Sequence, residues 1–315
     1  MKLIRTLDDL PAEFRACAVS IGNFDGVHRG HARIVERLVS RARNIGGRSL
    51  AFTFDPHPVR ILRPHAAPPP LTWTDRKAQL LAELGVECVV AYPTDEALLA
   101  LSPEEFFDEI VRRQLDARAV VEGPNFYFGH DRAGDIARLK SLCRKSRIAL
   151  DVVAPLVVDE QIVSSSRIRS LIAEGDVEQA RRMLTQPYRI RGMVTHGAAR
   201  GAKLGFPTAN IEAVDTLLPA SGVYAGRAYL DQSALAAAIN IGPNPTFGDT
   251  ALKVEAHLID FEGSLYGRPL EVDFLARLRD IQPFASPEVL IDQLHADVAR
   301  CREFFASAVS SPTEN

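Results

Sequence analysis

The first half of the chain alternates short apolar runs with amphipathic stretches. The apolar runs, which we expect to be strands, occupy residues 17–21, 49–54, 88–91, 119–121 and 149–153. Between them, apolar residues recur every three or four positions, which predicts helices with one buried face. These stretches occupy residues 32–45, 75–84, 103–115 and 135–147. Strands that alternate with helices predict a parallel sheet with helices on both faces and ligands at the carboxyl ends of its strands.

The pattern changes in the second half. Two more helices are expected at 166–174 and 177–184, and beyond them the apolar stretches become short and are interrupted by glycine and proline. These stretches occupy residues 188–195, 222–230, 236–241, 252–260 and 271–277. Short strands at even spacing predict a small β-barrel or sandwich, and a closing helix is expected from Ser286 to about Phe305.

The composition agrees with this picture and excludes several classes of function. The length of 315 residues fits two domains, which we place at 1–186 and 187–315. A net charge of −3 gives no electrostatic footprint for nucleic acid or an anionic membrane. No apolar run is long enough to span a bilayer, no secretory signal is present, and the four cysteines lack metal-binding spacing. We therefore expect a cytoplasmic protein that binds neither nucleic acid nor membrane.

A glycine-rich turn with two histidines, GNFDGVHRGH at residues 22–31, follows the first expected strand. His28 and His31 lie three residues apart around a helix start, so both imidazoles can face one point. Free N–H groups at a helix start suit a phosphate, and Gly30 leaves room for one to approach. Two imidazoles could stabilise charge as pyrophosphate leaves. An isolated HxGH is equally compatible with a helix-start turn that carries surface histidines.

A second polar segment, SSSRIR at residues 164–169, opens a later helix. Hydroxyls and guanidinium groups there are good partners for phosphates, although such a segment alone is most often an N-cap with a charged face. Together with HxGH it resembles the HxGH nucleotidylyltransferase superfamily, whose second motif reads ISSTxxR. The resemblance implies catalytic roles for His28, His31 and Arg169. It also implies that phosphates are bound by Gly22, Asn23, Gly30, Ser165 and Ser166. A P-loop kinase is excluded because GxxxxGK[ST] is absent.

Two aromatic stretches narrow the family. FDPHP at 54–58 and GPNFYFGH at 123–130 each follow an expected strand, and the second resembles the G-x-[DN]-F-x-F-G element of prokaryotic FAD synthetases. Aromatic rings at a strand edge can stack on a flavin, although either stretch alone is more typical of core or turn. The resemblance implies that the flavin and its phosphates are contacted by Phe54, Pro56, Pro58, Asn125 and Phe128.

The second half carries a different set of motifs: GMVTHG at 192–197, RGAKLGFPTAN at 200–210, NIGPNPTF at 240–247 and VEAHLIDF at 254–261. From about Tyr188 to the final helix they resemble the riboflavin kinase module, which implies a small antiparallel β-barrel. The glycine-rich segment before FPTAN suits a flap that covers phosphate, and Gly197 and Gly205 are the residues of this flap that we expect to bind phosphate. The family usually has a basic residue near Ala202, so Lys203 or Arg200 is expected to replace it in the flap.

Three residues of this module carry the expected chemistry. Thr208 and Asn210 are hard oxygen donors on one side of an extended segment, and they fit a Mg²⁺ that bridges ATP phosphates. Phosphoryl transfer needs mostly positioning and charge neutralisation. Glu255 could accept the proton of the ribityl 5′-hydroxyl. Alone, such a residue would more often be a solvent-facing carboxylate, but the motif order favours the catalytic role.

The joined modules are similar to the prokaryotic bifunctional riboflavin kinase/FMN adenylyltransferase family over nearly the whole chain. The resemblance implies that riboflavin and ATP give FMN and ADP, and that FMN and ATP then give FAD and pyrophosphate, both with Mg²⁺. The expected partners are riboflavin, FMN, ATP and, transiently, further copies of the chain. Two alternatives stay open: a riboflavin kinase whose first domain serves another acceptor, and a flavin-binding regulatory module without catalysis.

Overall fold

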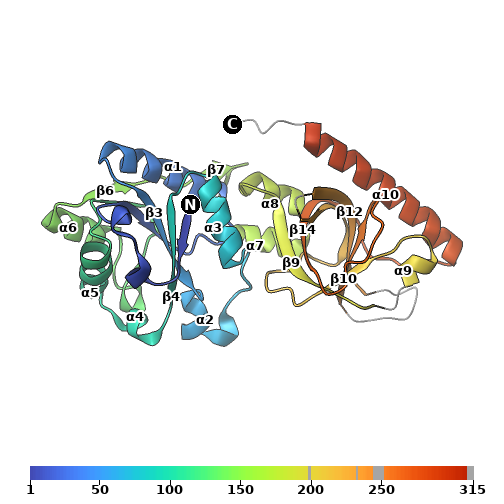
Figure 1. Cartoon of the computed structure of the whole chain (residues 1–315), viewed down its shortest axis with the longest axis horizontal. Helices are drawn as coiled ribbons and strands as arrows, with labels where there is room; N and C mark the ends of the chain where they lie inside the picture. Colours follow the sequence, from blue (N-terminus) through green and yellow to red (C-terminus); the bar gives the residue numbers. More distant parts are fainter. Residues whose placement is uncertain (198–199, 232, 244–251, 311–315) are drawn as a thin grey trace. The chain divides into compact units, whose positions relative to one another are not determined.

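The structure is a computed structural model that describes residues 1–197, 200–231, 233–243 and 252–310 (Figure 1). The chain forms two compact units. The first comprises Met1–Pro68 and Thr72–Ser164, and the second comprises Pro69–Leu71 and Ser165–Asn315. The compact units therefore divide at Ser164, earlier than residue 186, and the domain boundary expected there stays a prediction.

The first unit is built on a six-stranded sheet in the order β1-β4-β3-β2-β5-β6, with every neighbouring pair parallel. Its strands are β1 (Lys2–Ile4), β2 (Ala18–Ile21), β3 (Ser49–Asp55), β4 (Cys88–Pro93), β5 (Ala119–Glu122) and β6 (Ala149–Val152). The predicted parallel sheet is confirmed. Strand β1 was not predicted, because three residues are too few to show a period.

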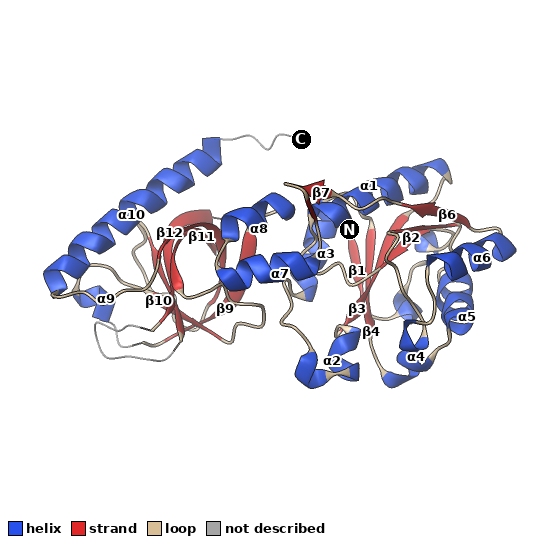
Figure 2. Ribbon diagram, turned by 180° about the vertical axis from the view of Figure 1, so that it is seen from behind, coloured by secondary structure: helices blue, strands red, loops and turns tan. Residues whose placement is uncertain are grey.

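Helices cover both faces of this sheet, as the alternating pattern predicts (Figures 1 and 2). They are α1 (Arg29–Asn44), α2 (Pro58–Leu62), α3 (Thr74–Glu83), α4 (Glu96–Ala100), α5 (Pro103–Phe106), the π-helix η4 (Phe107–Gln114) and α6 (Ile136–Ser146). Short 3-10 turns lie at Leu7–Asp9, Ala12–Phe14, Pro64–Ala66 and His130–Arg132, and a small hairpin joins β7 (Val157–Val158) to β8 (Gln161–Ile162). Leu38 of α1 and Leu81 of α3 pack in one cluster, whereas Phe107 of η4 and Leu139 of α6 pack in the other.

The expected helix at 103–115 is present but changes type along its length. Ser102 and Glu105 form a capping box at its start, and Pro103 occupies the first turn. After Phe106 the backbone continues as a π-helix, in which Leu115 donates to the carbonyl of Ile110. An apolar period cannot predict this change, because both helix types bury one face.

The second unit contains a closed barrel in the order β10-β13-β12-β11-β14-β9, with antiparallel neighbours throughout. Its strands are β9 (Tyr188–Thr195), β10 (Ala209–Glu212), β11 (Gly222–Leu230), β12 (Ser233–Gly242), β13 (Lys253–Leu258) and β14 (Pro269–Arg279). The barrel is therefore confirmed over the sandwich. Fully buried Tyr224 and Phe274 meet edge-on, with centroids 5.2 Å apart. Strand β10, which begins within the PTAN sequence and ends two residues after it, was not predicted as a strand.

The helices among the described residues of the second unit are α7 (Ser165–Glu174), α8 (Val177–Met183), α9 (Arg200–Lys203) and α10 (Pro287–Ser310). Arg277 of β14 donates its side chain to the carbonyl of Glu174 and its backbone N–H to Glu178, which ties α7 and α8 to the barrel. On α10, the buried carboxylate of Asp297 accepts three hydrogen bonds from Arg279 of β14. Both attachments pair a barrel arginine with a helix, and α10 confirms the predicted closing helix.

Two candidate active sites

The two histidines of the first motif lie together at the start of α1. His28 is the N-cap of this helix, and its Nδ1 accepts the backbone N–H of His31 at 3.2 Å. The two rings stack with centroids 3.6 Å apart and planes 12° apart. The ring of His31 also meets that of Phe24 edge-on at 5.3 Å. The structure therefore brings together the pair that the spacing predicts.

Both imidazoles are neutral at neutral pH. Burial lowers the pKa of His28 to about 4, although the carboxylate of Asp25 opposes this. Burial lowers the pKa of His31 well below its usual value, and the nearby His28 and Lys77 lower it further. In the part of the chain that the structure describes, Nδ1 of His31 is buried without a hydrogen-bond partner. The pair therefore places neutral ring nitrogens beside the start of α1, and Nδ1 of His31 is the one that lacks a hydrogen-bond partner in the described residues.

The glycine between the histidines keeps the pair close. A Cβ atom on Gly30 would lie 3.1 Å from two atoms of the His28 ring, which is tighter than ordinary contact. The missing side chain therefore makes room for an imidazole. This is a constraint that the sequence did not reveal.

The loop before the histidines is held by polar residues that the sequence reasoning missed. Asp25 Oδ1 accepts hydrogen bonds from the backbone N–H (3.1 Å) and hydroxyl (3.3 Å) of Thr72. Thr53 Oγ1 donates to the backbone carbonyl of Asn23 at 3.1 Å and accepts from Lys77 Nζ at 3.2 Å. The available signal was a threonine and a lysine at positions whose apolar neighbours predict burial.

Glu122, at the end of β5, is a further buried polar residue beside the site. Its carboxyl oxygen accepts the backbone N–H of Ile21 at 2.6 Å, which ties the ends of β2 and β5 together. Burial raises the pKa of Glu122 well above its usual range. The signal was a carboxylate that ends an apolar run.

The residues predicted to contact flavin lie in the last residues of β3 or just after β3 and β5, the two neighbours of β2. Phe54 is half-buried and meets Phe52 edge-on at 5.4 Å, while Pro56 precedes α2 and Pro58 begins it. Asn125 is exposed. Because parallel strands end at the same edge, both segments lie at the sheet edge that carries the histidine turn.

Phe128, predicted to contact flavin, has its ring in the core. The side chain is 6% exposed and stacks on Phe126 with centroids 5.3 Å apart. Tyr127 is 48% exposed, and the guanidinium of Arg132 lies 4.7 Å from its ring centroid. The accessible aromatic ring of this segment is therefore Tyr127.

The second phosphate motif lies in the other compact unit. Ser165 and Ser166 begin α7, and Arg169 donates its Nε to the carbonyl of Pro69 at 3.1 Å. The meeting of these residues with His28 and His31 stays a prediction.

The barrel brings Asn210 and Glu255 together. Asn210 of β10 lies opposite Glu255 of β13 and opposite Thr195 of β9, and Glu255 in turn lies opposite Asn240 of β12. In the described residues, Oγ1 of Thr195 is buried without a hydrogen-bond partner. The register therefore aligns polar side chains from four strands in one row.

Glycine and histidine fix the PTAN segment. A Cβ atom on Gly197 would clash with the side-chain amide of Asn210. Nδ1 of His257 hydrogen-bonds the carbonyl oxygen of Pro207 at 2.8 Å, and Phe206 meets the rings of His257 and His295 edge-on. Thr208 is half-buried just after this contact. The sequence did not single out His257 or His295.

The remaining flap and loop residues are either exposed or outside the described residues. Ala202, Lys203 and Gly205 are exposed on or beside α9. The side chain of Arg200 and the expected NPTF segment at 244–247 lie outside the described residues.

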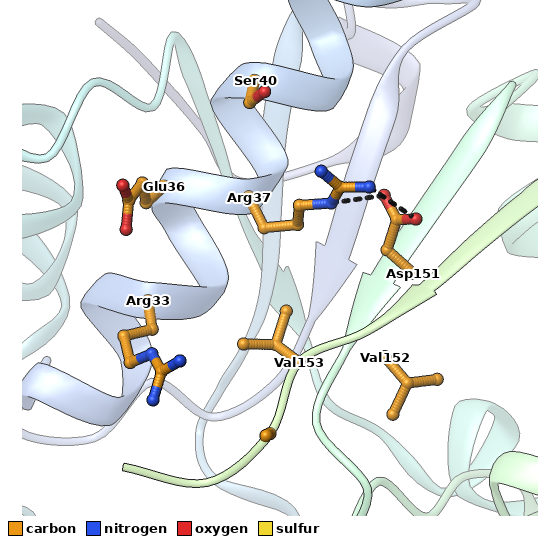
Figure 3. Close-up of a pocket in the computed structure, with 8 residues that line it drawn as sticks. Arg33, Glu36, Arg37, Ser40, Asp151, Val152 and Val153 are labelled. Carbon is orange, nitrogen blue, oxygen red and sulfur yellow. Dashed lines mark hydrogen bonds and ion pairs between the residues drawn. The ribbon is translucent and has the colours of Figure 1, made fainter.

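A cleft of about 490 Å³ lies beside α1 and the end of β6, and none of the predicted site residues lines it (Figure 3). Arg37 reaches across it to the carboxylate of Asp151, with hydrogen bonds of 3.0 and 3.1 Å. Arg41 binds the same carboxylate at 2.7 and 2.6 Å, and together they hold its pKa below the usual value. The carboxylate of Asp151 is thus held in ion pairs with two arginines, which gives it a structural role.

The described residues lack two kinds of feature. They contain no group of three or more His, Cys, Asp or Glu side chains arranged to hold a metal ion. They also contain no helix that is both long and apolar enough to cross a membrane.

Comparisons with known proteins match both units. The FAD synthetase family model matches residues 10–167, and the riboflavin kinase family model matches residues 184–305. A bifunctional riboflavin kinase/FMN adenylyltransferase of Pseudomonas fluorescens is 38% identical over 97% of this chain and 98% of its own length. One of Escherichia coli K12 is 33% identical over the same shares.

A solved structure also matches nearly the whole chain. It is a crystal structure from Streptococcus pneumoniae, described as a macrolide-efflux protein, with 30% identity and a TM-score of 0.85 over 95% of this chain and 98% of that one. The motifs, the two folds, the order of the family models and the full-length relatives agree. The chain therefore belongs to the family of bifunctional riboflavin kinases/FMN adenylyltransferases.

Proposed function

We propose which residues of this bifunctional riboflavin kinase/FMN adenylyltransferase carry out each of its two reactions. FMN is adenylylated at His28 and His31, and riboflavin is phosphorylated beside Asn210 and Glu255. The observation that carries this assignment is that the two constellations lie in different compact units, each matched by its own family model.

Adenylylation requires stabilisation of a charged phosphate. A phosphate oxygen of FMN attacks the α-phosphorus of ATP, and the bond to pyrophosphate breaks. Because Nδ1 of His28 accepts a hydrogen bond, the neutral ring carries its proton on Nε2, where it can be donated to a phosphate oxygen. The start of α1 adds the positive end of its dipole.

The remaining binding roles in this reaction follow the motifs. Arg169 with Ser165 and Ser166 is proposed to hold the β- and γ-phosphates, and Gly22, Asn23 and Gly30 to border the α-phosphate. The buried Oδ1 of Asn23 has no hydrogen-bond partner in the described residues, which leaves it available to a ligand. For the flavin we propose Phe54, Pro56, Pro58 and Asn125, with Phe128 supporting Phe126 from the core.

Phosphorylation requires a proton acceptor next to bound ATP. Glu255 accepts the proton of the ribityl 5′-hydroxyl as that oxygen attacks the γ-phosphorus and ADP leaves. Gly197 and Gly205 are proposed to leave room for the phosphates.

Mg²⁺ is proposed as the metal of this reaction. Thr208 and Asn210 would hold it through hydroxyl and amide oxygens, and the unpartnered hydroxyl of Thr195 opposite Asn210 fits this set of hard donors. When bound, Mg²⁺ neutralises phosphate charge. A cytoplasmic location and transient self-association also remain proposals.

The test is a time course. The full chain is incubated with riboflavin, ATP and MgCl₂, and riboflavin, FMN and FAD are separated by chromatography. FMN should appear first and FAD should follow from it. FMN that accumulates without FAD would support the alternative in which the first unit serves another acceptor.

A further inference from the structure

Lys77 is a buried cation behind the histidine pair. Only 7% of the residue is exposed, on the inner side of α3. Its Nζ donates to Thr53 Oγ1 at 3.2 Å, and that hydroxyl donates to the backbone carbonyl of Asn23 at 3.1 Å. Burying an ammonium group is costly unless polar or charged neighbours stabilise it. An apolar side chain would fill the same space without this cost, so packing does not explain the lysine.

The loop that Lys77 reaches has an unfavourable backbone. Phe24 and Val27 are buried, yet they have positive φ angles of 47° and 37°. Such conformations are unfavourable for residues with a side chain and persist only when the surroundings impose them. On one side, Thr72 binds Asp25 and accepts the N–H of Gly26 at 3.2 Å. On the other side, Thr53 holds the loop by its hydrogen bond to Asn23 and accepts a hydrogen bond from Lys77.

Three ionisable groups interact with the charge of Lys77: Asp25, Asp55 and His31. Burial lowers its pKa, and the carboxylates of Asp25 and Asp55 raise it again. Toward the site, the ammonium and His28 both lower the pKa of His31, after the larger effect of burial. A cation at this position therefore disfavours a second positive charge on His31 and helps to keep that ring neutral.

We propose that Lys77 is a positioning residue of the adenylylation site, which acts through Thr53 to hold the loop that carries the stacked His28–His31 pair. It does not touch substrate in this proposal. The inference rests on the assignment of adenylylation to His28 and His31, and it adds that α3 supplies part of the site.

The test compares Lys77→Met and Lys77→Gln in the full chain, with Lys140→Met as the control on an exposed lysine of the same unit. Lys77→Met loses both charge and donor, so turnover of FMN to FAD should fall roughly 10- to 100-fold, below the loss for a direct transition-state donor. KM for FMN should change much less, and riboflavin phosphorylation should stay within about twofold of wild type. Lys77→Gln keeps a donor for Thr53 and should retain more turnover.

A second readout does not depend on catalysis. In a chain with labelled histidine, NMR follows the imidazole of His31 as the pH is lowered. Its protonation should occur at higher pH in both Lys77 variants than in wild type, whereas Lys140→Met should leave it unchanged.

The outcomes distinguish a failure of this inference from a failure of the assignment of adenylylation to His28 and His31, on which it rests. The role of Lys77 is wrong if Lys77→Met matches Lys140→Met in turnover and titration, or if Lys77→Gln loses as much turnover as Lys77→Met. If the titration moves but His28→Asn still forms FAD, the assignment of adenylylation fails and the structural role of Lys77 stands. Should Lys77→Met unfold, which a thermal scan detects, Lys77→Gln carries the same test.

Discussion

His28 caps the helix that carries His31, and the two rings stack with centroids 3.6 Å apart. One side chain thus performs two tasks, because its Nδ1 accepts the N–H of His31 while the rest of its ring forms half of the imidazole pair. A substitution at His28 removes both the cap and the ring. A test of the chemistry must therefore keep the cap.

His28→Asn should abolish FAD formation and spare FMN formation. Asparagine is a good N-cap, so the helix start is kept while the imidazole is lost. Loss of one preorganised donor should lower turnover of FMN to FAD by roughly 10²–10³-fold. Chromatography of products from FMN and ATP measures it, and His28→Ala, which also loses the cap, should be about 1 kcal/mol less stable. FAD formation within a few-fold of wild type would place adenylylation elsewhere.

Glu255→Gln should have the opposite effect. The amide keeps the shape of the carboxylate but cannot accept a proton, so riboflavin phosphorylation should fall by roughly 10²–10⁴-fold. FMN supplied directly should still become FAD. Glu212→Gln, on an exposed position of β10, is the matched control and should leave both rates unchanged. Normal kinase turnover in Glu255→Gln would remove this residue from the mechanism.

The buried His28 should make folding stability depend on pH. Its folded pKa of about 4 lies below the usual value near 6.5, so the unfolded chain binds the proton first as pH falls. Stability is therefore lost between pH 6.5 and 4, by on the order of 2 kcal/mol from pH 7 to pH 5 for this group. Urea unfolding of the first unit at the two pH values measures the loss, which should be smaller in His28→Asn. An equal loss in both would mean that His28 titrates normally.

The two helices before the barrel should stabilise a fragment that carries the kinase residues. Fragments 165–315 and 187–315 both contain Thr208, Asn210 and Glu255, and both should make FMN but not FAD. The shorter one lacks the α8 side chains that are buried and the acceptors of Arg277, so it should be roughly 3–5 kcal/mol less stable. Thermal melting of the two compares them. Equal melting temperatures would show that α7 and α8 do not stabilise the barrel.

The sequence predicted the elements well where the apolar pattern is strong. Strands β3 and β9 begin at the predicted residues, and the predicted closing helix is present as α10, which buries Val298 and Cys301. The prediction failed where the apolar pattern does not distinguish one element from another. Strand β10 is short and begins within PTAN, and the π-helix after Phe106 has the same apolar face as an α-helix.

The candidate sites were predicted through motifs, whereas their supports were not. HxGH predicts that two imidazoles meet, because they lie three positions apart on one turn. Nothing local links Lys77 to Thr53 and Asn23, since these residues meet only when α3, β3 and the loop assemble. Likewise, the pairing of Asn210 with Glu255 depends on the register of two strands far apart in the chain.

The central claim is that the two reactions use separate residues and share FMN as the intermediate. Mixing His28→Asn with Glu255→Gln in the presence of riboflavin, ATP and MgCl₂ tests this directly. Neither variant alone should convert riboflavin to FAD, but the mixture should, because one releases the FMN that the other adenylylates. A mixture that makes no FAD, although His28→Asn makes FMN and Glu255→Gln converts added FMN, would contradict the claim that released FMN connects the two sites.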